Sequence, residues 1–189
     1  MLKKDQLRKW NTIASEILYF DNKSNNYNSV NFDFLREIGM PSECWEFSFE
    51  NLKEKNLKTV NYLWKLQDIN YDNFLSIGSN GSGDPIAINI ATEELIYFNH
   101  DNFFEEILIN SNLSCFAQCV LKIDSFLNNL IKLEPNSIFE NEFTDQSYEL
   151  LLSELKEIDP RVFSLKTNHW NIMLDSLKWE RDEERKDRK

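Results

Sequence analysis

Few residues of this chain have the types and spacing that catalysis requires. His100 and Asp101 are adjacent and form the only plausible general base with a carboxylate partner, but an ordinary hydrogen-bonded pair is the favoured interpretation. His169 precedes Trp170 at an expected helix start, a position typical of a cap or a surface residue. A Cys–His dyad through Cys44 stays open, but no nucleophile signature surrounds that cysteine. We therefore predict no catalytic residue and no enzyme.

The clearest motif is a cluster of glycines between two expected strands. Gly78, Gly81 and Gly83 fall within six residues, and Asp84 follows them. A phosphate-binding loop needs a helix after its glycines and a Lys after the last one, whereas here a strand follows and Asp84 takes that place. A calcium loop would need more oxygen ligands at alternate positions. The motif predicts a tight turn in which the Asp84 carboxylate bonds local amides, and a loop facing a partner at the sheet edge is the functional alternative.

The cysteine, histidine and acidic residues do not have the spacing of a metal or cofactor site. Cys115 and Cys119 lie four residues apart on one helical face and are expected to be small buried apolar groups. A zinc site requires three or four closely spaced ligands, and the sequence offers no such group. The pairs at residues 93–94 and 105–106 are neighbouring glutamates in expected strands, so their side chains face opposite sides and form no acid–base couple. We predict no metal and no cofactor.

The charge of the chain limits its partners. The formal net charge is −11 over 189 residues; the last twelve residues carry +1, so the first 177 carry −12. A protein with this negative charge repels nucleic acid and anionic membranes and attracts basic partners. The alternative is that the excess of acidic residues only keeps the protein soluble. The chain has no apolar run of about eighteen residues and its N-terminus lacks the apolar stretch of a secretion signal. We expect a cytoplasmic protein without direct nucleic-acid or membrane binding.

Hydrophobic periodicity predicts helices at both ends of the chain and strands between them. The first twenty residues have the spacing of one amphipathic helix, and a polar loop to Ser29 leads to a short helix over residues 30–38. Gly39 is its expected left-handed terminator, and Pro41 prevents continuation. Helical spacing returns after Ser111 or Asn112, in helices that end before Pro135, span residues 145–158 and begin near residue 168.

The middle of the chain predicts an antiparallel meander. Alternating polar and apolar residues indicate six strands, at residues 45–50, 60–66, 73–77, 85–91, 94–99 and 104–110. Their short connections favour antiparallel neighbours. The predicted fold is α+β, with an approximately six-stranded, largely antiparallel sheet, N-terminal helices and a C-terminal helical layer. We expect one domain over residues 1–177 (helix and loop 1–29, helix and meander 30–110, helical layer 111–177), and a charged tail over 178–189 that is a solvated, frayed helix end.

Four segments, in this order, resemble a known family. They are FLREIGMP at residues 34–41, FLSIGSNGSGDPIAI at 74–88, LIYFNHD at 95–101 and INSNLSCF at 109–116. Over about residues 30 to 177 the chain is similar to the SUKH superfamily, best known as bacterial immunity proteins of polymorphic toxin systems. The resemblance implies an α+β sheet with packed helices, a toxin as partner and no catalytic residues. One departure is the segment ATEE at residues 91–94, where many relatives turn with a glycine.

Outward-facing groups supply the candidate toxin interface. Its members are aromatic, acidic or amide residues on the expected strands and the loop near the glycine turn: Trp45, Glu46, Glu50, Asp101, Asn102, Glu105 and Glu106. Glu46 and Glu50 are expected on one strand face, and all the acids are interpreted as a patch that meets a basic toxin surface, with ordinary solvated surface as the alternative. Trp45 and Trp64 are candidate anchors, with the core as their alternative place.

The function that these observations predict is binding and neutralisation of a cognate toxin, with a basic nuclease-type domain as the candidate partner. A regulatory or scaffold module acting on a host protein is the alternative, since related domains in fungi resemble cell-wall regulators. An enzyme using His100 and Asp101 ranks last.

Overall fold

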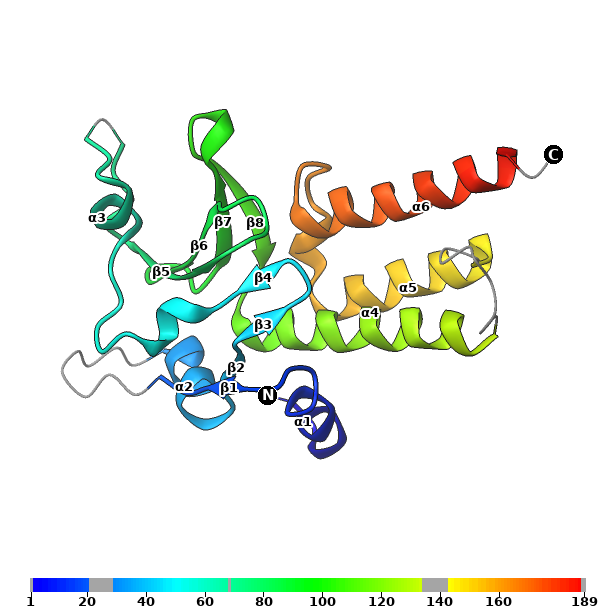
Figure 1. Ribbon diagram of the computed structural model, residues 1–189, viewed down its shortest axis with the longest axis horizontal. Helices are drawn as coiled ribbons and strands as arrows, with labels where there is room; N and C mark the ends of the chain where they lie inside the picture. Colours follow the sequence, from blue (N-terminus) through cyan, green and yellow to red (C-terminus); the bar gives the residue numbers. More distant parts are fainter. Residues whose placement is uncertain (1, 21–28, 68, 134–142, 188–189) are drawn as a thin grey trace. The chain divides into compact units, whose positions relative to one another are not determined.

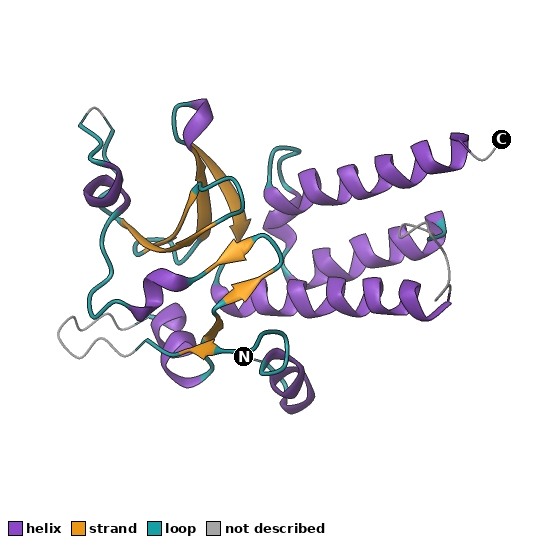
Figure 2. Ribbon diagram, in the orientation of Figure 1, coloured by secondary structure: helices purple, strands orange, loops and turns teal. Residues whose placement is uncertain are grey.

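The computed structural model describes residues 2–20, 29–67, 69–133 and 143–187 (Figure 1). The chain divides into two compact units, Met1–Ala117 and Gln118–Lys189. Strands lie in the first unit, and the second is helical (Figure 2). Among the described residues, no helix is both long enough and apolar enough to span a bilayer. The prediction of one domain over residues 1–177 stays a prediction.

The first unit is built around a six-stranded antiparallel sheet. Its strands follow one another in chain order: β3 (Glu43–Cys44), β4 (Phe47–Ser48), β5 (Phe74–Ser79), β6 (Pro85–Asn89), β7 (Leu95–Asn99) and β8 (Glu105–Asn110). Every pair of neighbours is antiparallel, so the α+β fold and the antiparallel meander are confirmed. The helices of this unit are α1 (Lys4–Trp10), α2 (Val30–Glu37), α3 (Val60–Trp64) and the 3₁₀ turns η1 (Glu50–Lys53) and η2 (His100–Asn102).

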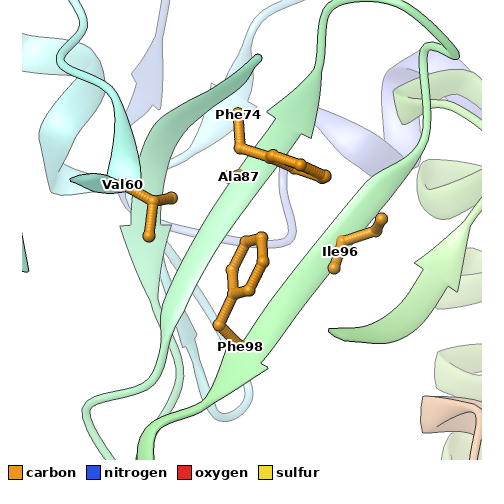
Figure 3. Close-up of a cluster of buried hydrophobic side chains, with 5 residues drawn as sticks. All are labelled: Val60, Phe74, Ala87, Ile96 and Phe98. Carbon is orange, nitrogen blue, oxygen red and sulfur yellow. The ribbon is translucent and has the colours of Figure 1, made fainter. Parts of the chain in front are cut away.

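Apolar side chains cover both faces of this sheet. Val60 of α3 packs with residues of β5, β6 and β7 in a buried cluster shown in Figure 3: Val60, Phe74, Ala87, Ile96 and Phe98. A second group joins Trp10, Phe47, Phe49 and Phe116, whose rings meet edge to face with centroids 5.4 to 6.4 Å apart. The second group ties α1 and the first turn of α4 (Leu113–Leu133) to the β4 segment.

The N-terminal helix is shorter than predicted. α1 ends at Trp10, and Ile17–Leu18 form β1, which pairs with β2 (Met40–Pro41). Tertiary contacts override the helical spacing here: the Trp10 indole N–H donates to the Gly39 carbonyl at 3.0 Å, and Gly39 turns the chain back at φ 79°. The left-handed terminator at Gly39 is confirmed. The predicted loop lies mostly outside the described residues, while Ser29 caps α2.

Of the six predicted strands, one was wrong and one was only partly right. Residues 45–50 are the turn of a tight hairpin followed by β4 and the start of η1, with Trp45 in the left-handed region at φ 54°. Residues 60–64 are helix α3 instead of a strand. The Thr59 hydroxyl accepts from the Tyr62 amide as an N-cap, and Lys65 ends the helix at φ 54°. Five residues are too few for alternation to exclude one turn of helix.

The glycine cluster serves two purposes. Gly78 lies inside β5, where a Cβ would overlap the carbonyl oxygen of Ser48 in β4. The turn itself is the segment after β5, with Gly83 at φ 84° and the Asn80 side chain accepting from the amides of Ser82 and Asp84. The predicted tight turn is therefore present, but Gly78 permits close approach of two strands rather than a turn.

Buried Asn31 supports the β6–β7 turn, whose residues 90–94 include no glycine. Glu93 takes the left-handed conformation there at φ 67°. The Asn31 side-chain amide donates to the Glu93 carbonyl at 2.6 Å, and its backbone N–H donates to the Glu93 carboxylate at 3.2 Å. The Asn31 side-chain oxygen accepts from the Leu113 amide at 2.8 Å. One side chain thus joins the β6–β7 turn, α2 and the start of α4.

The second unit contains most of α4, α5 (Asp145–Ile158), η3 (Pro160–Phe163) and α6 (His169–Asp187). The predicted bounds of α5 are confirmed. The interpretation of residues 178–187 as a solvated, frayed end is wrong, because α6 continues to Asp187 and Arg181 is only 2% exposed. Its guanidinium donates to the Phe143 carbonyl at 3.0 Å and to the Asp145 carboxylate at 2.7 Å. These bonds fix α6 to the start of α5.

His169 is buried, so its expected place at a cap or on the surface was wrong. Burial lowers the pKa of His169 to about 4. Because histidine in an unfolded chain has a pKa of about 6.5, the unfolded state binds more protons between these values, and stability falls as the pH falls. We expect about 3 kcal/mol of the unfolding free energy to be lost through this group between pH 7 and pH 4.

Urea denaturation of the wild type and of His169→Gln, each from pH 7 to pH 4, measures this effect. The variant loses ring packing at pH 7 and approaches or exceeds the wild-type stability at pH 4, since it has no proton to bind. A constant difference between the two proteins across this range would contradict the assignment.

Candidate functional site

Asp84 is the centre of a polar cluster at the end of the sheet. The residue is 5% exposed, and its carboxylate accepts from the Asn80 side-chain amide at 2.9 Å and from the His100 backbone N–H at 2.9 Å. The Nδ1 atom of His100 lies 2.6 Å from the same carboxylate. The predicted bond to a local amide is present at the Asn80 side chain, and two further contacts come from His100, sixteen residues away. Asp84 fixes η2 to the β5–β6 turn.

His100 pairs with Asp84 more closely than with its neighbour in sequence. Its Nε2 atom lies 3.4 Å from the Asp101 carboxylate, and Asp101 is 87% exposed. The ring of His100 also lies against Trp64, with centroids 5.4 Å apart. The histidine thus has polar contacts on both ring nitrogens and an aromatic neighbour, an arrangement typical of a positioned structural side chain.

Two further carboxylates, those of Glu46 and Glu105, lie near Asp84. Partial desolvation raises the pKa of Glu46, and the charge of Asp84 adds to it. Burial raises the pKa of Tyr97 to about 12, with further contributions from Asp84, Glu46 and Glu105. The β3–β4 turn, the β5–β6 turn and β8 therefore bring three carboxylates to one region. Such a region favours a cation or a basic side chain as its neighbour.

The predicted interface residues do not form one patch. Glu46 and Glu105 belong to the cluster around Asp84, and Asn102 joins it by donating to the Glu105 carboxylate at 2.6 Å. Glu106 faces the other side of β8, where partial desolvation raises its pKa and Glu94 adds to it. Glu50 does not share a strand face with Glu46, because it begins η1 and pairs with Lys53 at 2.8 Å. Trp45 is exposed on the β3–β4 turn.

An exposed aromatic surface adjoins this cluster, and sequence reasoning identified only one of its residues, Trp64, as a candidate anchor. We define it by Trp64 and Phe103 with their exposed neighbours Tyr62 and Leu63. Trp64 of α3 contacts Phe104 with ring centroids 5.2 Å apart, so α3 lies beside the connection from η2 to β8. Phe103 is 90% exposed. No pattern separates such a phenylalanine from the core residues around it in the sequence.

The backbone that presents Phe103 is strained. Phe103 and Phe104 are consecutive left-handed residues, at φ 52° and 57°. Residues with a Cβ pay on the order of 1 kcal/mol or more for this conformation. Surrounding bonds hold it in place: Asn99 accepts from the Asp101 and Asn102 amides, and the Tyr71 hydroxyl donates to the Phe104 carbonyl at 3.0 Å. The tip of this loop is therefore ordered.

None of the three cysteines forms a disulfide bond; Cys44 and Cys119 are buried, while Cys115 is only half-buried. In the described parts of the chain, no group of three His, Cys, Asp or Glu side chains is placed to hold a metal ion. What the site offers is a contact surface with acidic groups, hydrogen-bonding amides and exposed rings.

The antiparallel sheet with C-terminal helices is the α+β architecture that the SUKH resemblance implies, and the chain is a SUKH superfamily protein. A family model described as "SUKH-4 immunity protein" matches residues 26–176, so the chain belongs to the SUKH-4 immunity protein family. Comparisons with curated proteins and with solved structures gave no match. Family membership indicates toxin immunity, implies a cognate toxin as partner and is generally associated with non-enzymatic proteins.

Proposed function

We propose that this protein neutralises its cognate toxin in the cytoplasm by stoichiometric binding, without turnover, and that the toxin is a basic, nuclease-type domain. The observation that carries the proposal is a charge asymmetry. Residues 66–121, which contain β5 to β8, include eight Asp and Glu and no Lys or Arg. Glu105 and Asp101 lie exposed at the edge of this region, beside the aromatic surface.

The proposal follows from charge complementarity. A nuclease holds phosphates with Lys and Arg, so the face that binds nucleic acid is basic. An acidic protein that occupies this face blocks the substrate without needing to perform chemistry. Long-range attraction between the two faces also speeds their encounter, which matters for an inhibitor that must capture a toxin before it acts.

The test is co-expression with the toxin encoded by the neighbouring gene. The proposed function expects growth to be rescued, and expects the two proteins to co-purify as a complex whose mass corresponds to a fixed stoichiometry. Catalytic amounts of the protein should give no protection in a purified activity assay, whereas equimolar amounts should. Protection at amounts far below the toxin concentration would indicate turnover and overturn the binding mechanism.

A charge-reversal pair tests which face the toxin approaches. We expect Asp101→Lys with Glu105→Lys to lower the association rate constant about tenfold or more at low ionic strength, because both exposed acids border the proposed face. The matched control is Glu149→Lys with Glu157→Lys, which makes the same charge change on exposed positions of α5. Stopped-flow binding at several salt concentrations measures both. Equal decreases of the association rate constant in the two variants would show that net charge alone, and not the position of these acids, sets the rate.

A further inference from the structure

We propose that Phe103, supported by Trp64, is the apolar anchor of the toxin complex, and that the toxin receives it in an apolar socket bordered by Lys and Arg. This inference rests on the proposed function and goes further, because it names the residue that sets the lifetime of the complex. Nearly the whole Phe103 side chain is exposed, and its backbone is in a conformation that phenylalanine rarely adopts. In the isolated chain neither feature is compensated by packing of that ring.

The anchor is held rigidly before binding. Three side chains fix the loop on which it stands: Asp84 in the β5–β6 turn accepts from the His100 amide, Tyr71 donates to the Phe104 carbonyl, and Trp64 of α3 packs edge to face on Phe104. A partner therefore gains the burial of Phe103 without paying to order the loop. Aromatic anchors with this kind of rigid support are the residues that dominate protein interfaces.

The charges around the anchor determine what kind of partner fits. Asp101 and Glu105 flank Phe103 on the η2 and β8 side, and Asn102 adds an amide. On the α3 side the charges are basic, since Lys58 lies over the Tyr62 ring and Lys65 ends the helix. A socket with Lys or Arg opposite η2 and β8 complements this surface. The positive groups of a phosphate-binding face meet that requirement.

Two other occupants fit less well. A second copy of the chain would bring the same acids of β5 to β8 against each other, and the only basic groups named at this surface, Lys58 and Lys65, lie on its α3 side. Single-stranded nucleic acid stacks on exposed aromatics, but it also needs a positively charged groove for its phosphates. The acidic region beside Phe103 repels them.

The experiment compares Phe103→Gly and Phe103→Ser with Trp179→Ser, which removes an exposed aromatic side chain from α6 in the other unit. Binding to the inactivated toxin domain from the neighbouring gene is measured by surface plasmon resonance. We expect both Phe103 variants to raise the dissociation rate constant about 30-fold with little change in the association rate, and Trp179→Ser to change it less than threefold.

Urea denaturation tests whether Phe103 serves binding or the stability of the fold. Phe103→Gly is expected to leave the unfolding midpoint no lower than in the wild type, because relief of strain at φ 52° offsets the larger entropy of glycine in the unfolded chain and no buried contact is lost. The combination of undiminished stability and a weaker complex identifies a residue maintained for binding. A lower midpoint in Phe103→Gly would show that the ring stabilises the fold, and would overturn the inference.

The outcomes separate this inference from the proposed function. Unchanged dissociation in the Phe103 variants, with an intact wild-type complex, refutes the anchor and leaves stoichiometric neutralisation standing. Absence of a complex with wild-type protein overturns both. A wild-type dimer in sedimentation that Phe103→Ser abolishes would assign the aromatic surface to self-association and likewise refute the anchor.

Discussion

Gly78→Ala is expected to lower the free energy of unfolding by at least about 4 kcal/mol, or to prevent folding. A Cβ at this position would overlap the Ser48 carbonyl oxygen and lie 2.9 Å from the Cα atom of Phe49. Both are backbone atoms, so no side-chain rotation relieves the overlap, and the chain around β4 has to move away from β5. Phe49 is fully buried, and this movement would also disturb its contact with Phe116.

The matched control for this substitution is Gly81→Ala. The nearest atoms to a Cβ there are Cβ and the carbonyl oxygen of Glu46, at 3.8 and 3.9 Å, which is ordinary contact. We expect a change within about 0.5 kcal/mol. Urea denaturation followed by circular dichroism measures both variants. Similar midpoints for the two would show that β4 is not held against β5 as tightly as the structure indicates.

Asn31→Ala is expected to cost about 4 kcal/mol of unfolding free energy. The side chain is fully buried and makes two hydrogen bonds, to the Glu93 carbonyl and from the Leu113 amide. Alanine leaves both backbone groups without this partner and removes support from the left-handed Glu93. The loss should appear in urea denaturation monitored at several signals, because Asn31 joins three elements of the first unit.

Asn102→Ala provides the comparison for Asn31. Asn102 is an exposed asparagine whose side-chain amide also donates a hydrogen bond, to Glu105, but both groups remain accessible to water. We expect its removal to change the unfolding free energy by less than about 0.5 kcal/mol. If Asn31→Ala were no more destabilising than Asn102→Ala, the buried bonds would not be the support that the β6–β7 turn depends on.

Sequence reasoning succeeded where a local pattern and the tertiary structure agree. The Gly39 terminator, the central strands and α5 all have strong periodicity bounded by glycine, proline or a capping residue. Residues 60–66 were misassigned because side-chain alternation outweighed the signal of a Thr59 cap. Trp45 and Glu93 adopt positive φ without being glycine, so the turns they form have no sequence signature.

The proposed interface could be predicted only in part, for a related reason. Acidic residues near the glycine turn were identified from charge, and the structure brings Glu46 and Glu105 into one region around Asp84. Glu50 was placed wrongly because β4 spans only Phe47–Ser48 and includes neither Glu46 nor Glu50. Phe103 was missed because composition does not distinguish an exposed ring from a buried one. Arg181 was missed because its partners at residues 143 and 145 are distant in sequence.

The absence of Lys and Arg from residues 66–121 has a practical consequence for mapping the complex. Trypsin has no cleavage site there, so it releases residues 66–122 as one long peptide that contains β5 to β8. Amine-reactive cross-linkers find no lysine in residues 66–121, and a map made with them would miss the whole stretch. Carbodiimide coupling joins its carboxylates directly to lysines of the bound toxin, so a zero-length cross-link from Asp101 or Glu105 would identify the contacting lysine.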